Sequence, residues 1–180
     1  MVKGKNIKSA MERRNIKKLI EALKRGGVVR REKVKLKHAG ISGFYLDIKT
    51  AYGYPDILDE LCRRIQKSMP KTINCVAASG YGGLPLATAF ALKYKLKLVL
   101  VREKPKQHGR NVWIDGYVPK KEDRVWIVDD VLTTGKSINQ AVKMLVSAKT
   151  KVVGCSVIVK RSSRKLIIPC RYLMTAEDLL

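Results

Sequence analysis

The chain has 180 residues, 46% of them hydrophobic, so it is long and apolar enough to bury the core of one globular domain. Its 38 Lys and Arg against 15 Asp and Glu give a formal net charge of +23, and residues 1–40 alone hold 14 basic residues against 3 Glu. The apolar content excludes a disordered chain, and no apolar run approaches the length of a membrane span.

Predicted helices and short apolar strands alternate along the chain. Helices are expected at residues 6–25, from Pro55 onward, and at 84–94 and 137–148, with Gly82 and Gly83 breaking the chain before the third. Strands are expected at residues 28–37, 43–48, 73–78, 97–102, 112–118, 124–128 and 151–160. This alternation predicts an α/β fold with a parallel sheet.

The cysteines are scattered and form no C-x-x-C pair. They are Cys62, Cys75, Cys155 and Cys170. Each lies in or near an apolar segment, so we expect reduced and mostly buried thiols in a cytoplasmic protein. A zinc site is not expected, because His38 and His108 are the only histidines that could complete one.

Residues 125–137 combine the features of a phosphate site and of a hydroxyl-binding site. An apolar strand ends in Asp129 and Asp130, and a short loop then leads into a helix. The loop consists of Thr133, Thr134, Gly135, Lys136 and Ser137. Unpaired backbone N–H groups and the helix dipole at such a loop suit a phosphate. The carboxylates would repel a phosphate, so we expect them one step away, facing sugar hydroxyls or a magnesium shell. The pattern therefore fits a ribose 5-phosphate.

Two further loops follow predicted strands. Residues 79–83 hold three glycines, so their N–H groups can point together at an anion, although an ordinary Gly-rich turn is equally open. Residues 103–111 are polar and can cover a polyanion, although a solvated basic turn is the usual alternative. Ligands of open α/β sheets bind at the carboxyl ends of strands, so we expect 79–83, 103–111 and 129–137 to form one site.

The thirteen residues 125–137 resemble the phosphoribosyl pyrophosphate (PRPP) motif of type I phosphoribosyltransferases. That resemblance implies a type I phosphoribosyltransferase-like α/β fold, with a mostly parallel twisted sheet flanked by helices and a small N-terminal hood region. We expect a single domain over residues 1–180. Its parts would be a basic helix and hood strands (about 1–48) and a PRPP-binding core (about 49–180).

The same resemblance implies roles around PRPP. Asp129 and Asp130 would hold the ribose hydroxyls, and the 133–137 loop would anchor the 5-phosphate. The pyrophosphate would lie on Ser79, Gly80, Tyr81, Gly82 and Gly83. Magnesium would be held through PRPP and water, with Asp129 or Asp130 as a further ligand.

The pattern Arg-x-x-x-Lys-x-His-Gly over residues 102–109 resembles the mobile catalytic loop of orotate phosphoribosyltransferases. By that resemblance Arg102 and Lys106 would neutralise the leaving pyrophosphate, and His108 would hydrogen-bond to it. In that family the loop reaches the neighbouring subunit's site, which implies a homodimer with the 103–111 loop acting in trans.

Residues on the base side also resemble the orotate enzymes. Lys37 would reach orotate or the pyrophosphate, Tyr45 would pack near the base, and Thr133 would approach it. Arg161 falls where that family binds the orotate carboxylate, and a bidentate Arg–carboxylate pair would select orotate over uracil. A strand-edge Lys and a surface Arg are the alternatives for Lys37 and Arg161.

The sequence departs from the family at four places. Gly82 stands where some relatives carry Lys or an acid, so the pyrophosphate grip would rest more on the backbone. Glu103 stands where several relatives carry Lys, which removes one positive charge. Lys160 occupies a position that is often acidic. The 162–166 segment is shorter than usual, which affects the expected base-side wall.

These resemblances imply an enzyme that converts orotate and PRPP into orotidine 5′-monophosphate and pyrophosphate in pyrimidine synthesis, with magnesium. One alternative is a phosphoribosyltransferase for another base, such as a purine. Another is a non-catalytic regulator that senses PRPP and binds nucleic acid through its basic face. The charge could instead steer anionic substrates inward. Nucleic acid is therefore an open but less favoured partner, and no membrane partner is expected.

Overall fold

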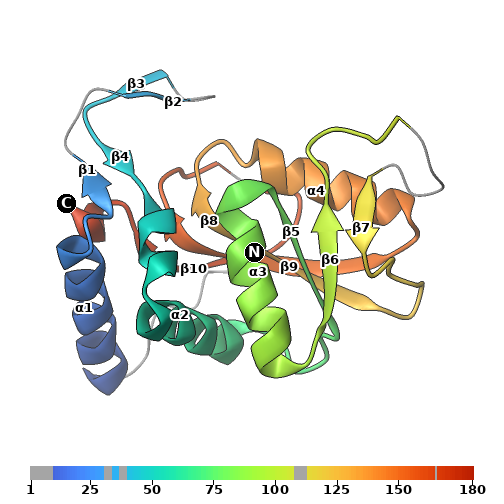
Figure 1. The fold of residues 1–180 in the computed structure, drawn as a ribbon, viewed down its shortest axis with the longest axis horizontal. Coiled ribbons are helices and arrows are strands. Elements are labelled where there is room, and N and C mark those ends of the chain that lie inside the picture. Colours follow the sequence, from blue (N-terminus) through green and yellow to red (C-terminus); the bar gives the residue numbers. More distant parts are fainter. Residues whose placement is uncertain (1–9, 31–33, 37–39, 108–112, 165) are drawn as a thin grey trace.

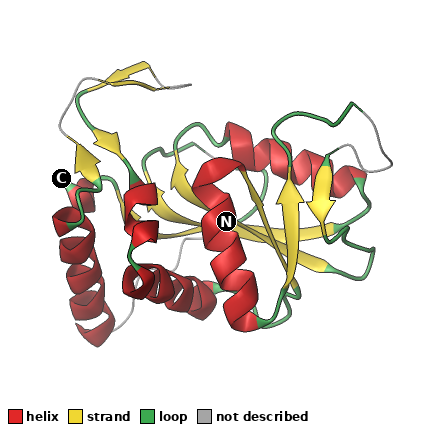
Figure 2. Cartoon of the chain, in the orientation of Figure 1, coloured by secondary structure: helices red, strands yellow, loops and turns green. Residues whose placement is uncertain are grey.

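The computed structural model describes residues 10–30, 34–36, 40–107, 113–164 and 166–180. At its centre lies a six-stranded sheet of order β10-β9-β8-β5-β6-β7 (Figures 1 and 2). Its strands are β5 (Cys75–Ser79), β6 (Lys97–Val101), β7 (Ile114–Gly116), β8 (Arg124–Leu132), β9 (Lys151–Lys160) and β10 (Cys170–Thr175). All neighbours are parallel except β6 and β7. The predicted mostly parallel sheet is confirmed.

Helices cover both faces of the sheet. They are α1 (Ala10–Arg25), α2 (Pro55–Ser68), α3 (Gly80–Tyr94) and α4 (Lys136–Ser147), with 3-10 turns η1 (Ile48–Gly53) and η2 (Glu177–Leu179). Along β8, Trp126 and Val128 pack in the cluster shared with α1, α2 and α3, while Val125 and Ile127 pack in the cluster shared with α4. Side chains of a strand alternate between faces, so a sheet covered on both sides needs the continuous apolar run seen in β8.

Two small antiparallel pairs precede the core. β1 (Val29–Arg30) pairs with β4 (Tyr45–Leu46), and β2 (Val34–Leu36) pairs with β3 (Gly40–Ser42). Figure 1 shows them extending from the end of the molecule where α1 lies. They occupy the region predicted as hood strands, and β4 is shorter than the expected 43–48.

Helix α3 begins earlier than predicted. It starts at Gly80, so Gly82 and Gly83 lie in its first turn and do not break the chain. The close packing of this turn explains the glycines, since a Cβ atom at Gly83 would stand 2.7 Å from the carbonyl oxygen of Val128. The predicted 79–83 loop is therefore mostly a helix N-terminus.

Two strands also differ from the prediction. β8 continues past residue 128 to Leu132, because its pairing with β9 includes Asp129 opposite Val157 and Leu132 opposite Lys160. β10 was not predicted; it forms an edge of the sheet, and Met174 is its one buried residue. Within the described residues, no helix has the length and apolar character of a membrane span.

Candidate active site

The described parts of the three loops predicted to form one site meet at the carboxyl ends of β5, β6 and β8, which are neighbours in the sheet. The distances from a Cβ atom added at each of two glycines of α3 show how closely α3 lies to the other two loops. At Gly82 the Cβ would lie 2.6 Å from Cγ of Asp130, and at Gly80 it would lie 2.5 Å from Oε1 of Glu103. Gln140 of α4 donates from Nε2 to the carbonyl oxygen of Glu103 at 3.1 Å. The fold thus brings the residues that follow β5, β6 and β8 into contact with one another.

The two acids at the end of β8 have different surroundings. Asp129 is buried, and its Oδ1 accepts a hydrogen bond from the Asp130 backbone N–H at 3.0 Å. Burial and then the charge of Asp130 raise the pKa of Asp129 well above its usual value. Asp130 is half-buried, and its Oδ2 lies 3.9 Å from Nζ of Lys49. Asp130 is thus the more accessible carboxylate of the pair.

The loop after β8 presents a helix N-terminus. Gly135 has a left-handed backbone (φ +75°) and is buried against the Leu166 side chain, where a Cβ atom would collide. Thr133 and Thr134 are half-buried, while Lys136 and Ser137 are exposed in the first turn of α4. The N–H groups of this turn and the helix dipole provide the arrangement expected for a phosphate.

The first turn of α3 provides a second helix N-terminus. Gly80 has φ +73°, and Tyr81 is 87% exposed. Tyr52 of η1 donates from its hydroxyl to the carbonyl oxygen of Gly82 at 2.8 Å. Burial and the nearby Asp130 raise the pKa of Tyr52, which therefore stays protonated and keeps this bond.

The cations that follow β6 are held by a carboxylate on β7. Arg102 Nη1 lies 2.9 Å from Asp115 Oδ2, and Lys106 Nζ pairs with Asp115 Oδ1. These bonds lower the pKa of Asp115, with Lys106 the larger cause. His108, the third predicted pyrophosphate residue, lies outside the described residues.

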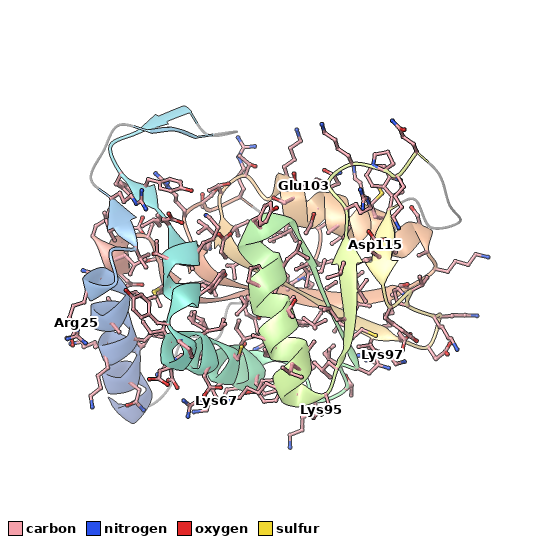
Figure 3. All side chains as sticks on the ribbon, viewed as in Figure 1. Arg25, Lys67, Lys95, Lys97, Glu103 and Asp115 are labelled. Carbon is pink, nitrogen blue, oxygen red and sulfur yellow. The ribbon has the colours of Figure 1, made fainter. Side chains whose placement is uncertain are left out.

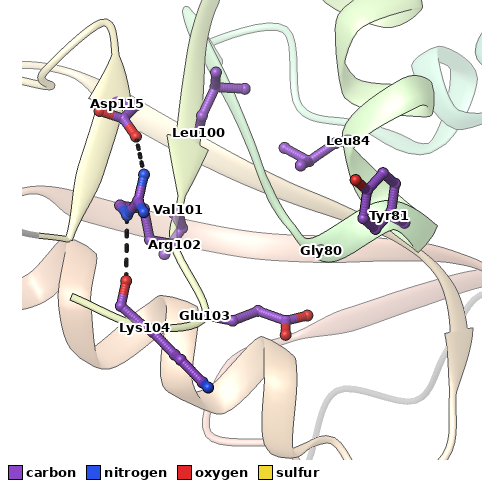
Figure 4. Close-up of a pocket in the computed structure, with 9 residues that line it drawn as sticks. All are labelled: Gly80, Tyr81, Leu84, Leu100, Val101, Arg102, Glu103, Lys104 and Asp115. Carbon is purple, nitrogen blue, oxygen red and sulfur yellow. Dashed lines mark hydrogen bonds and ion pairs between the residues drawn. The ribbon is translucent and has the colours of Figure 1, made fainter. Parts of the chain in front are cut away.

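A pocket of about 510 Å³ lies between α3 and this segment (Figure 4). Its lining includes Gly80 and Tyr81 from α3 and Arg102, Glu103 and Asp115 from the opposite side. Figure 3 shows Glu103 and Asp115 in the upper half of the view and Lys67, Lys95 and Lys97 in the lower half.

On the base side, Arg161 stacks on Phe44. Its guanidinium lies 4.2 Å from the ring centroid, and Nη2 donates to the Phe44 carbonyl oxygen at 3.4 Å. Burial lowers the pKa of Arg161. The Arg161 N–H also donates to Leu132 O at 2.9 Å, next to Thr133 in the chain. Arg161 and Thr133, predicted from separate segments, are thus close neighbours.

Lys49 links the N-terminal region to the acids. Its Nζ lies 3.4 Å from the Tyr45 hydroxyl, 3.2 Å from Asp47 Oδ1 and 3.9 Å from Asp130 Oδ2. Lys49 thereby links Tyr45 to Asp130 at the end of β8, and the place of Tyr45 near the base stays a prediction. Lys37 lies outside the described residues.

Sequence reasoning missed Lys49, Tyr52 and Asp115, all of which contact predicted site residues. None belongs to a contiguous motif. The only signal for Asp115 was its position in a predicted strand directly after the basic loop. Lys160, noted as a departure, lies with its Nζ 5.1 Å from the ring centroid of Tyr172.

Comparison with known proteins identifies the class that this fold and site define. Residues 50–169 match the family model described as "Phosphoribosyl transferase domain", and the chain belongs to that family of pentosyl-transferring enzymes. Among its sequence relatives is an orotate phosphoribosyltransferase of Pyrococcus furiosus, 38% identical over 123 residues and matched over 67% of each chain. The resemblance drawn from the sequence is confirmed.

Solved structures agree with this assignment. The orotate phosphoribosyltransferase of Aeropyrum pernix superposes with a TM-score of 0.79 and 27% identity, covering 90% of this chain and 96% of that one. The UMP synthase of Leishmania donovani gives a TM-score of 0.76 and 27% identity. There the match covers 91% of this chain but only 37% of the longer protein.

Proposed function

We propose that this protein transfers the ribose 5-phosphate of PRPP to orotate, giving orotidine 5′-monophosphate and pyrophosphate. The observation that carries this proposal is the hydrogen bond from the Arg161 backbone N–H to Leu132 O, because it brings a side chain able to bind a carboxylate close to Thr133 of the PRPP motif. Its relatives among orotate phosphoribosyltransferases support the same reaction.

The reaction needs no nucleophilic side chain. As pyrophosphate leaves the anomeric carbon, the ribose becomes oxocarbenium-like. The ring nitrogen of orotate attacks that carbon and releases its proton to water or to the departing pyrophosphate. The protein holds the two substrates in line. The 133–137 loop binds the 5-phosphate, Asp129 and Asp130 bind the ribose hydroxyls, and the first turn of α3 binds the pyrophosphate.

The charge that develops on pyrophosphate needs cationic partners. Arg102 and Lys106 supply them, together with His108. Each of the first two is 38–41% exposed at its side chain, so both can exchange their present partner for a substrate oxygen.

The base is recognised by its carboxylate. Arg161 offers a planar fork of donors that matches a carboxylate in two parallel bonds, and its stacking on Phe44 fixes the plane of that fork. Tyr45 and Lys37 complete the base side. Uracil lacks the carboxylate and would leave the guanidinium without this partner.

Magnesium fits this site as a companion of PRPP. The ion prefers oxygen ligands and keeps several waters, commonly using one or two carboxylates with substrate phosphates. Asp130, half-buried at the end of β8, is suited to such a shell. Within the described residues, no three His, Cys, Asp or Glu side chains form a metal-binding group. Bound magnesium would neutralise part of the pyrophosphate charge.

The active form is proposed to be a cytoplasmic homodimer in which the 103–111 loop of one subunit serves the site of the other. The motivation is the loop pattern over residues 102–109. Sedimentation of the active protein tests the oligomer, and a monomer with full activity would exclude action in trans.

The first experiment follows the ultraviolet absorbance of orotate after PRPP, magnesium and protein are mixed. Adenine, hypoxanthine and uracil serve as parallel substrates. Loss of orotate absorbance alone is expected. Turnover of another base would retain the PRPP site but overturn the roles of Arg161 and Tyr45. If no base reacts, the proposed phosphoribosyltransferase activity is excluded. Measurements of DNA binding with and without PRPP would then test the alternative of a non-catalytic, PRPP-sensing regulator.

A further inference from the structure

Asp115 forms ion pairs with Arg102 and Lys106, the two described residues of the 102–109 loop that are proposed to bind pyrophosphate. Its Oδ2 lies 2.9 Å from Arg102 Nη1, and its Oδ1 pairs with Lys106 Nζ (Figure 4 shows the Arg102 contact). Arg102 also donates from Nε to the Lys104 carbonyl oxygen at 3.2 Å. A single carboxylate thus binds two of the side chains that are proposed to bind the pyrophosphate of the substrate.

The sheet register explains this contact. β6 and β7 are antiparallel with Leu100 opposite Asp115, and the Arg102 N–H continues the ladder by donating to Trp113 O at 2.9 Å. Arg102 lies two residues beyond Leu100, so it is the diagonal cross-strand neighbour of Asp115 on the same face. The strand register therefore places the Asp115 carboxylate next to Arg102.

We propose that Asp115 is a positioning residue, a resting-state partner that holds Arg102 and Lys106 until pyrophosphate, bound in the site that the 103–111 loop serves, displaces it, and so sets the affinity for PRPP. This inference rests on the pyrophosphate role proposed above for the two cations. No bond is made or broken; one anion replaces another.

The exchange is physically reasonable because the three side chains remain accessible. Arg102, Lys106 and Asp115 keep 41%, 38% and 30% of their side-chain surface exposed. Ion pairs at such exposure contribute little stability. A pyrophosphate offers several charged oxygens to the same donors and binds them more strongly than one carboxylate does. Asp115 therefore weakens ligand binding without preventing it.

The chain contains a matched control. Asp59 on α2 also binds one Arg and one Lys, with Arg63 Nη2 at 2.9 Å and Lys93 Nζ on its other oxygen. It is 41% exposed and does not line the pocket. Asp59→Asn removes one negative charge from a similar Arg–Asp–Lys cluster that lies outside the pocket.

The test measures binding of magnesium pyrophosphate and of PRPP by calorimetry to the wild type, Asp115→Asn, Asp115→Glu and Asp59→Asn. We expect Asp115→Asn to tighten both ligands about threefold to tenfold at low salt, with the gain reduced at high salt. Asp115→Glu should restore most of the wild-type affinity. Asp59→Asn should bind as the wild type does.

A double-mutant cycle separates this role from a merely structural one. In a Lys106→Ala background, Asp115→Asn should tighten pyrophosphate binding less than it does in the wild type, because Lys106, one of the two cations that the substitution releases, is absent. In turnover assays Asp115→Asn should lower the KM for PRPP with kcat little changed. Unchanged or weaker binding in Asp115→Asn, or no measurable pyrophosphate binding by either protein, would overturn the proposal.

The binding assay needs no base. If Asp115→Asn tightens pyrophosphate but orotate does not react, the proposed reaction fails and the role of Asp115 stands. If orotate reacts but the variant binds pyrophosphate as the wild type does, the role of Asp115 fails and the reaction stands.

Discussion

Gly82 and Asp130 are in direct contact. A Cβ atom at Gly82 would lie 2.6 Å from Cγ and 2.7 Å from Oδ2 of Asp130. Gly82 belongs to the helix turn proposed to bind pyrophosphate, and Asp130 ends the strand proposed to bind ribose. The absence of a side chain at Gly82 therefore sets where the Asp130 carboxylate can lie.

Gly82→Ala should impair PRPP use more than folding. Asp130 is half-buried and can rotate away from the new methyl group, so the position of the carboxylate changes rather than the fold. A misplacement of about 1 Å can cost as much as a hundredfold, and we expect kcat/KM for PRPP to fall about ten- to a hundredfold. Steady-state kinetics and thermal melting check this.

Gly53→Ala is the control for that substitution, because a Cβ atom there meets nothing within 4 Å. It should leave kcat/KM unchanged. Wild-type kinetics for Gly82→Ala would show that Asp130 needs no fixed position.

Lys106→Ala should depress turnover far more than stability. The side chain is 38% exposed and pairs with Asp115, so its removal leaves the core intact. Loss of one cation facing the leaving pyrophosphate is expected to lower kcat about a hundredfold or more. Lys104→Ala removes the same charge two residues away and should have a small effect. Wild-type turnover by Lys106→Ala would show the loop assignment to be wrong.

Arg161→Ala should weaken the binding of orotate and leave the binding of PRPP unchanged. The KM for orotate is expected to rise about tenfold or more, because the carboxylate loses a bidentate charged partner. The KM for PRPP should stay near its wild-type value. Exposed Arg164, three residues on, provides Arg164→Ala as a control of equal charge. Equal effects of the two variants on orotate would indicate general electrostatics and no specific carboxylate site.

Asp123 should confer acid sensitivity on folding. It is fully buried and accepts hydrogen bonds from the Lys120 N–H, the Tyr117 hydroxyl and Lys97 Nζ, each at 2.8 Å. Burial alone raises the pKa of this carboxyl, but these donors together lower it well below the usual value. A depressed folded-state pKa contributes stability above about pH 4 that is lost as pH falls through the folded-state pKa.

Asp123→Asn should therefore cost about 1–3 kcal/mol of unfolding free energy at neutral pH, since a neutral amide cannot accept all of these bonds. The difference from the wild type should shrink toward pH 2. Urea unfolding across this pH range measures it. Exposed Glu122 supplies Glu122→Gln as a control, and a pH-independent difference for Asp123→Asn would contradict the linkage.

Local pattern was enough for much of the fold. The apolar runs of β5, β6, β8 and β9 and the amphipathic spacing of α2 are periodic within short windows, so they predict their own elements. The PRPP motif is also contiguous, so residues 129–137 could be assigned before any three-dimensional information. Order along the chain then predicted that the loops after parallel strands meet at one edge.

Other features depended on neighbours distant in sequence. β8 extends through Asp129 and Asp130 because β9 pairs with it there, and β10 is a strand because β9 offers it an edge. The glycines of α3 looked like a chain break, but Gly83 allows a helix to pack against Val128. Tertiary packing overrides local preference in each case.

The sequence by itself determined the class of fold, and it was enough to predict the phosphate and sugar motif and the cations after β6, because each depends on adjacent residues. Only the tertiary structure decided that Asp115 holds those cations, that Lys49 bridges Tyr45 and Asp130, and that Arg161 stacks on Phe44. The reason is physical: strand register and helix packing choose such partners, and neither is encoded by the spacing of a single segment.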